Sequence, residues 1–174
     1  MRSLIRLARD SDLENLASLV AHYWEFENIP GFDRARILTL LTDFLSQPRL
    51  GGCWVAEEGG RLIGYLLVVY LFSVEHGGMM AEIDEFFVLS ENRALHAGTA
   101  LLDTASQAMT QKGITHLQLQ LSTQNLNAKR FYERHGFRSI PGRGILSKAL
   151  LASECGSVTS LPLHDLISDP ILEK

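Results

Sequence analysis

A strand followed at once by a capped helix is the most constraining pattern in this chain, and it lies within residues 114–137. The stretch ITHLQLQLS alternates leucine with polar residues, which predicts a strand with one buried and one polar face. In the following NLNAKRFYERHGF, Asn125 can cap a helix and Gly136 can end it in the left-handed conformation. Residues at steps of three and four share one face of that helix: Ala128, Phe131, Tyr132 and His135. The chain is therefore expected to place a helix directly at the end of a β-strand.

The rest of the chain predicts further strands and helices in a mixed order. Strands are expected over residues 4–8, 53–57, 61–72, 82–88 and 145–151, with Pro48 to Gly52 as a turn and Glu58-Gly59-Gly60 as a hairpin. A capping box of Ser11 and Glu14 predicts a first helix, with an apolar stripe of Leu13, Leu16, Val20 and Trp24. Helices are also expected over 33–46, with Ile37, Leu40, Leu41 and Phe44 inward, and over 97–109. This order predicts an α/β fold, a mixed sheet layered by helices.

The composition describes an ordinary globular chain and excludes several classes of function. With 174 residues, 46% hydrophobic and 21% charged, the chain is expected to form one domain with a sizeable core. A net charge of −4 argues against general binding to nucleic acid or anionic membranes. Neither the two cysteines, Cys53 and Cys155, nor the six histidines have metal-ligand spacing, so no metal is expected. Without a signal peptide or spanning segment, the protein is expected to be cytoplasmic, with both thiols reduced.

A second segment, AEIDEFFVLSENRALHAGTALL, predicts an anion site. It reads as a strand ending at Val88, a polar connection and a helix beginning near Ala97. The first N–H groups of a helix lack internal partners, and the helix dipole favours negative charge beside them. A diphosphate is the expected occupant.

Together these two segments resemble the GCN5-related N-acetyltransferases (GNAT family), which move an acetyl group from acetyl-CoA to an amine. The last conserved segment of that family is similar to Asn-x-x-Ala-x-x-Phe-Tyr-x-x-x-Gly-Phe from Asn125. The family's pyrophosphate loop, Gln/Arg-x-x-Gly-x-Gly/Ala, is similar to Arg93-Ala94-Leu95-His96-Ala97-Gly98, with His96 in place of the first glycine. If that position needs a positive φ, a non-glycine residue costs about 1–3 kcal/mol, although histidine is enriched there.

The resemblance covers about residues 3–151 and implies a mixed, mostly antiparallel central sheet flanked by about four helices. Residues 1–151 would form the acetyltransferase domain, and 152–174 a C-terminal extension that is docked or mobile. The implied cosubstrate is acetyl-CoA, and a backbone N–H near Phe87 or Val88 would stabilise the oxyanion. Asn125 would order either the cofactor or, as a cap alone, the helix. The implied cofactor-binding residues are Phe87, Val88, Arg93, His96, Ala97, Gly98, Thr99 and Asn125.

Acetyl transfer also needs a group that takes a proton from the amine. A lysine-like amine has a pKa near 10.4, so only about one in 2,500 is neutral at pH 7. Glu82, Asp84 and Glu85 are the candidate carboxylates, and strict alternation would put Glu85 on the opposite face from the other two unless a bulge intervenes. The segment IDEFFV resembles the corresponding strand of diamine acetyltransferases, which favours Asp84 and Glu85. The alternative is that these residues are solvated or salt-bridged at the rim.

Tyr132 matches the general acid of the family and would serve the departing CoA thiolate. A phenol pKa of about 10 lies above a thiol's 8.5, so full proton transfer would be uphill by roughly 2 kcal/mol. Tyr132 is therefore expected to act largely as a hydrogen-bond donor.

The sequence thus favours an N-acetyltransferase in which a primary amine attacks acetyl-CoA directly within a ternary complex. A degenerate, non-catalytic module that binds CoA or a partner is the alternative, because of His96. Glu25, Glu27, Glu75 and Glu82 would suit a cationic small molecule such as a polyamine or amino sugar, and a peptide amine fits equally. A homodimer is compatible with the C-terminal extension.

Overall fold

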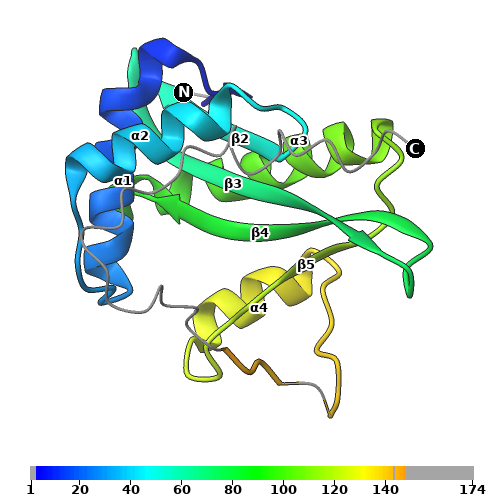
Figure 1. The fold of residues 1–174 in the computed structure, drawn as a ribbon. Helices are drawn as coiled ribbons and strands as arrows, with labels where there is room; N and C mark the ends of the chain where they lie inside the picture. The colour runs from blue at the N-terminus through cyan, green and yellow to red at the C-terminus, as the bar shows by residue number, and fades with distance from the viewer. Residues whose placement is uncertain (1–2, 143, 148–174) are drawn as a thin grey trace, which may run out of the picture. The chain divides into compact units, whose positions relative to one another are not determined.

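The computed structural model describes residues 3–142 and 144–147 (Figure 1). It divides the chain into two compact units, one ending at Thr123 and the other beginning at Gln124, and each is described by itself. The first unit contains β1 (Leu4–Leu7), α1 (Leu13–Phe26), α2 (Arg34–Leu45), β2 (Gly51–Glu58), β3 (Arg61–Ser73), β4 (Gly78–Val88), α3 (Ala97–Gln111) and β5 (Leu117–Leu119). Two 3-10 turns, η1 (Asp10–Asp12) and η2 (Ser90–Leu95), precede α1 and α3. The second unit contains α4 (Leu126–Arg134).

The first unit is built on a five-stranded sheet in which the strands follow one another in chain order. Strands β1 to β4 pair antiparallel, whereas β5 pairs parallel with β4. The expected hairpin between β2 and β3 is confirmed: Gly59 and Gly60 both have positive φ, as a tight two-residue turn of this kind requires. The expected mixed, mostly antiparallel sheet is therefore present.

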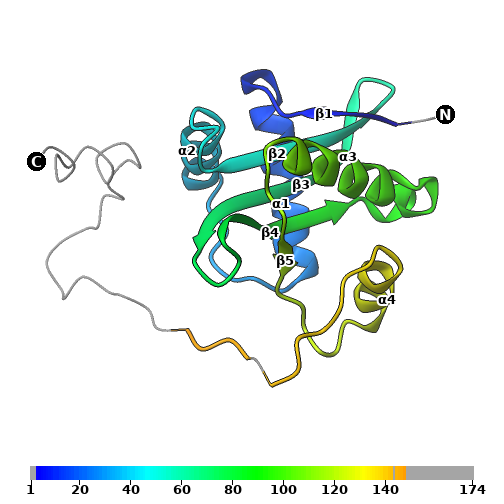
Figure 2. The same cartoon turned by 90° about the vertical axis from the view of Figure 1, so that its right-hand side faces the viewer.

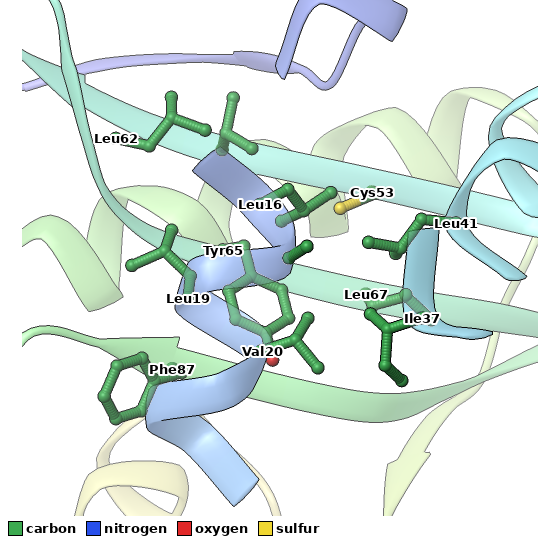
Figure 3. Packing of buried hydrophobic residues seen from close by; sticks show 12 residues of the cluster. Leu16, Leu19, Val20, Ile37, Leu41, Cys53, Leu62, Tyr65, Leu67 and Phe87 are labelled. Atoms are coloured by element: carbon green, nitrogen blue, oxygen red, sulfur yellow. The ribbon is translucent and has the colours of Figure 1, made fainter. Parts of the chain in front are cut away.

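Helices cover both faces of this sheet. Helices α1 and α2 pack on one face around a hydrophobic core cluster, and α3 lies behind the strands on the other face (Figure 3). Figure 2 shows the same sheet turned by 90°. Residues 62–68 of β3 are buried without interruption, because a central strand with two covered faces has no solvent side. The principal core residues include Leu16, Leu19, Val20, Ile37, Leu41, Cys53, Tyr65 and Leu67.

Helix α1 begins differently from the expected capping box. Ser11 lies in η1, and the helix starts only at Leu13. The carboxylate of Asp12 accepts the N–H of Arg9 at 2.8 Å and holds the guanidinium of Arg6 at 2.6 Å. Arg6 also reaches Glu57 at 2.7 Å. Asp12 thus forms an ion pair with Arg6, and Arg6 links this turn to Glu57 at the end of β2.

Three other local expectations need correction. Leu40 was expected inward but is 39% exposed, because the buried side of α2 runs through Ile37 and Leu41. The turn after α2 ends at Leu50, so Gly51 and Gly52 belong to β2. A Cβ at Gly51 would lie 1.9 Å from a backbone oxygen of β3, so only glycine permits the strands to pair there. Strand β4 begins at Gly78 rather than residue 82, and its extra length pairs with the end of β3.

The last two expected strands also differ. β5 is limited to three residues, none of them fully buried, because it pairs only with residues 81–83 of β4. Of the strand expected over 145–151, residues 145–147 have no regular structure, and Leu146 is fully exposed. These residues follow Pro141, Gly142 and Gly144, which disfavour strands. Residues 148–151, the extension over 152–174 and Cys155 lie outside the described residues.

Helix α4 is capped at both ends as the sequence predicts. The side chain of Asn125 accepts the N–H of Ala128 at 3.1 Å. At the other end, Gly136 has φ +86° and its N–H binds the carbonyl of Glu133, while the N–H of Phe137 binds the carbonyl of Tyr132. The rings of Tyr132 and Phe137 lie 5.3 Å apart, which adds the apolar contact typical of this helix ending.

Candidate active site

A β-bulge lies within the acidic segment of β4, which runs from Glu82 to Glu85. Val68 pairs with Ile83 and Leu67 pairs with Glu85, which leaves Asp84 as an extra residue without a partner on β3. The bulge changes the alternation of side chains along β4. Glu82 and Glu85 lie opposite Val69 and Leu67, which belong to the same face of the sheet. The bulge, and not strict alternation, therefore decides which carboxylates share a face.

Strands β4 and β5 pair only up to the bulge. Their last pair is Ile83 with Leu119, and among the strand pairs of the described residues β4 has none on that side from Asp84 to Val88. The backbone of an edge segment like this presents N–H and C=O groups that can bind a ligand. The expected oxyanion donors near Phe87 and Val88 belong to this segment.

Both carboxylate oxygens of Glu85 accept hydrogen bonds from other elements of the fold. Its Oε1 accepts the indole N–H of Trp24 on α1, and its Oε2 accepts the hydroxyl of Tyr65 on β3, both at 2.8 Å. The side chain is half-buried. Burial raises the pKa of Glu85, the two hydrogen bonds oppose this shift, and the Asp84 carboxylate adds to it. Glu85 is thus a carboxylate with raised basicity at the point where β4 leaves β5.

The two neighbouring acidic residues have different surroundings. Asp84, on the bulge, is exposed, yet desolvation by the surrounding protein and then the nearby Glu82 carboxylate raise its pKa. Glu82 accepts the side-chain amides of Gln118 and Gln120, at or just after β5. Glu82 therefore ties the paired part of β4 to β5, whereas Asp84 and Glu85 lie where the strands separate.

Aromatic rings surround this acidic segment. Tyr23 and Phe26, near the end of α1, each lie 6.2 Å from the ring of Phe87. Trp24 meets Phe32 edge-on at 5.9 Å. Burial, followed by the charges of Glu85, Glu27 and Asp84, raises the pKa of Tyr23 to about 12, so its phenol stays protonated at neutral pH. Aromatic side chains of α1 thus lie near the Glu85 carboxylate.

The loop before α3 has a left-handed residue at the position where the resemblance expects a glycine. His96 has φ 59° and ψ 14°, in the left-handed region. Its carbonyl accepts the N–H of Ala100, and no side chain caps the helix. The amides of Ala97, Gly98 and Thr99 therefore begin the helix without side-chain partners. The prediction that histidine can occupy this glycine position in the left-handed conformation is confirmed.

Arg93 connects this loop to the end of β4. Its Nε donates to the carbonyl of Val88 at 2.9 Å, and its guanidinium lies over Phe26 at 4.7 Å and over Phe87 at 5.7 Å from the ring centres. The hydrogen bond to Val88 uses the Nε donor alone, so the Nη groups of Arg93 take no part in it. Arg93 therefore orders the junction of strand and loop in addition to any role with phosphate.

The second unit holds the remaining two predicted site residues. Asn125 caps α4, as described above, so its structural role is established. The ring centre of Tyr132 lies 5.3 Å from that of Phe131 and 5.3 Å from that of Phe137. Their catalytic roles remain predictions.

Sequence reasoning missed the residues that hold Glu85. Trp24 had been assigned to an apolar stripe, and Tyr65 lies in a continuous apolar strand. The available signal was chemical: a buried phenol or indole N–H needs an acceptor. Only the fold reveals that Glu85, 20 residues from Tyr65 and 61 from Trp24, supplies it.

No group of metal-binding side chains occurs among the described residues, and none of the described helices is long and apolar enough to cross a membrane.

Residues 13–137 match the acetyltransferase (GNAT) family, so the chain belongs to this family. The fold of solved relatives agrees. An integron cassette protein from the mobile metagenome of Cole Harbour Salt Marsh is 27% identical, with a TM-score of 0.75 over 86% of this chain and 91% of that one.

Two further relatives refine the comparison. An aminoalkylphosphonate N-acetyltransferase of Salmonella typhimurium is 29% identical over 84 residues, 48% of this chain and 54% of the relative. The chain thus spans about half the length of the curated relatives that it matches. A predicted acetyltransferase of Clostridium acetobutylicum, solved with acetyl-CoA, is 19% identical with a TM-score of 0.71 over 83% of this chain and 96% of that one, a likeness of fold.

Proposed function

We propose that this protein transfers the acetyl group of acetyl-CoA to a primary amine by direct attack in a ternary complex. The observation that carries the proposal is the separation of β4 from β5 at the Asp84 bulge, with Glu85 held at the same point. Family membership supports the acetyl chemistry. We further propose that residues 1–151 act as the acetyltransferase domain of a cytoplasmic protein.

The diphosphate of the cosubstrate would bind at the start of α3. The amides of Ala97, Gly98 and Thr99 lack side-chain caps, and the helix dipole favours an anion beside them. His96 in the left-handed conformation directs the chain into this helix, and Arg93 adds positive charge. Backbone groups of Phe87 and Val88 on the unpaired edge would contact the thioester arm, and Asn125 would order α4 for the cofactor.

Glu85 is the proposed proton acceptor, and Asp84 the group that attracts a cationic amine. The neutral amine nitrogen forms a bond to the thioester carbon, and the carbonyl oxygen becomes an oxyanion stabilised by a backbone N–H of Phe87 or Val88. The amine proton passes to Glu85, directly or through water. The C–S bond then breaks, and the CoA thiolate receives a hydrogen bond or a proton from Tyr132.

The acceptor is proposed to be a small amine or a peptide amine. Asp84, Glu82 and Glu85 favour a cation over an anion near the attacking nitrogen. The Salmonella relative, by its name, acts on an aminoalkylphosphonate, which supports a primary amine as the reacting group. We also propose that the protein forms a homodimer.

Isothermal titration of acetyl-CoA, followed by a thiol-release screen of primary amines, tests the proposal. We expect micromolar binding and release of CoA with at least one amine. Glu85→Gln should lower kcat/KM by about 10²–10⁴ with unchanged acetyl-CoA affinity. Absence of binding at millimolar acetyl-CoA would refute the function. Binding without turnover on any amine would instead support the non-catalytic module that the histidine in the loop suggests.

A further inference from the structure

We propose that Tyr65 and Trp24 are positioning residues that fix the orientation of the Glu85 carboxylate for proton transfer. The proposal deepens the function proposed above and rests on it. Each residue comes from a different element packed against β4: Trp24 from α1 and Tyr65 from β3.

The geometry fixes the carboxylate from two directions. Tyr65 on β3 donates to Oε2 and Trp24 on α1 donates to Oε1, each at 2.8 Å. One donor on each oxygen removes the rotation of the carboxylate plane that a single bond would allow. Each oxygen keeps a further acceptor direction, because a carboxylate oxygen can accept more than one hydrogen bond. A proton from an amine or a bridging water could therefore arrive at a defined place.

Both donors are themselves held by packing. Tyr65 is fully buried among α1 and the strands (Figure 3). Trp24 is half-buried, and its indole meets the ring of Phe32 edge-on at 5.9 Å. A buried hydroxyl or indole N–H that lost Glu85 would be left without an acceptor, which is costly. The donors and the carboxylate therefore hold one another in place.

The donors are neutral, so they lower the pKa of Glu85 less than a cationic partner would. Among the described residues, no lysine or arginine forms an ion pair with it. The titratable groups that face it are Tyr23 from α1, Cys53 from β2, Tyr65 from β3 and Asp84 on its own strand. The first three have raised pKa values and stay neutral at pH 7, which leaves Asp84 as the charged neighbour. A salt bridge would instead have lowered the pKa of Glu85 and weakened it as a base.

The proposal predicts a shift in pH dependence, with a definite sign. Both hydrogen bonds stabilise the ionised form of Glu85, so removing either one raises the pKa of the carboxyl group. In Tyr65→Phe and Trp24→Phe, the acid limb of kcat/KM should move up by about one pH unit, as expected for one hydrogen bond to a charged group. At the pH optimum, kcat should fall by about tenfold while the KM for acetyl-CoA stays within about twofold.

Tyr70→Phe is the matched control, because Tyr70 lies on the same strand and its ring contacts Lys112, outside the acidic segment. It should leave both the pH profile and kcat unchanged. Unchanged profiles in Tyr65→Phe and Trp24→Phe, with kcat equal to that of the control, would overturn the proposal. A purely structural role would lower stability and the amount of active enzyme without moving the acid limb.

A titration without substrate separates this inference from the proposed function. Carbon-13 NMR of the glutamate carboxyl groups, with Glu85 assigned from Glu85→Gln, gives the Glu85 midpoint directly. Tyr65→Phe and Trp24→Phe should raise this midpoint, and Tyr70→Phe should not. If the midpoint moves but no amine is acetylated, the proposed function fails and the coupling of these side chains stands. If the enzyme is active and neither the midpoint nor the acid limb moves, the inference is wrong.

Discussion

Replacing His96 by glycine tests how the loop before α3 is built. His96 has φ 59°, a region in which the Cβ of an L-residue approaches the following carbonyl. Glycine has no Cβ and adopts this conformation without that cost. Because the side chain of His96 is exposed, its removal is not expected to leave a cavity. The variant therefore changes the backbone strain and little else.

The magnitude follows from two opposing terms. Relief of the strained left-handed conformation raises the free energy of unfolding by about 1–2 kcal/mol. The greater conformational freedom of glycine in the unfolded chain lowers it by about 0.5–1 kcal/mol. The net gain in the free energy of unfolding should be about 0.5–1 kcal/mol, which for a chain of this size raises Tm by about 2–3 °C.

The same change should hardly affect the binding of acetyl-CoA. His96 already holds the left-handed conformation, so the amides at the start of α3 need no rearrangement to accept a diphosphate. We expect the Kd of acetyl-CoA to stay within about threefold, well below the tenfold change that corresponds to about 1.4 kcal/mol.

Thermal unfolding and isothermal titration measure the two effects. His96→Ala keeps the Cβ and should show no gain in Tm, which separates strain from loss of the imidazole. Asn28→Gly is a matched control, because Asn28 also has positive φ (56°) but asparagine tolerates it better, so little gain is expected. A tenfold or larger tightening of acetyl-CoA in His96→Gly would refute the reasoning, since it would show that the histidine distorts the binding loop. An unchanged Tm would refute the strain argument.

Three further outcomes are expected from single substitutions. Tyr132→Phe should lower kcat by no more than about 10²–10⁴ with little change in acetyl-CoA affinity, and unchanged turnover would remove this residue from the mechanism. In a urea titration, Gly51→Ala should lower the free energy of unfolding by at least about 2 kcal/mol, because its Cβ would lie 1.9 Å from a β3 carbonyl oxygen. Gly144→Ala is the control: a Cβ there meets no atom within 4 Å, so the free energy of unfolding should hardly change. Hydrogen bonds from Arg6 lower the pKa of Asp12, so this carboxylate stabilises the fold above its unfolded pKa near 3.9 and the contribution is lost as pH falls through the lower folded value. Asp12→Asn should therefore cost about 2 kcal/mol at pH 7 and progressively less as the pH falls below about 4, and a pH-independent loss in urea unfolding would contradict this.

Local patterns were predicted well because their causes lie within a few residues. The caps of α4, its left-handed Gly136 and the two-glycine hairpin all depend on neighbours in the chain. From the sequence, a left-handed conformation at His96 depended on whether this position needs a positive φ, and the structure shows that it has one. The ends of strands were predicted less well. β4 begins earlier than expected and β5 is short, because a strand extends only as far as a partner pairs with it.

The sequence by itself determined the family, the order of the elements and the acidic segment of β4, since motifs and periodicity are properties of local spacing. Tertiary structure alone decided how those carboxylates are placed and which groups bind them. The bulge at Asp84 is a mismatch between two paired strands, and it places Glu82 and Glu85 on one face. The donors to Glu85 come from α1 and β3, so only the packing of those elements against β4 brings them to it.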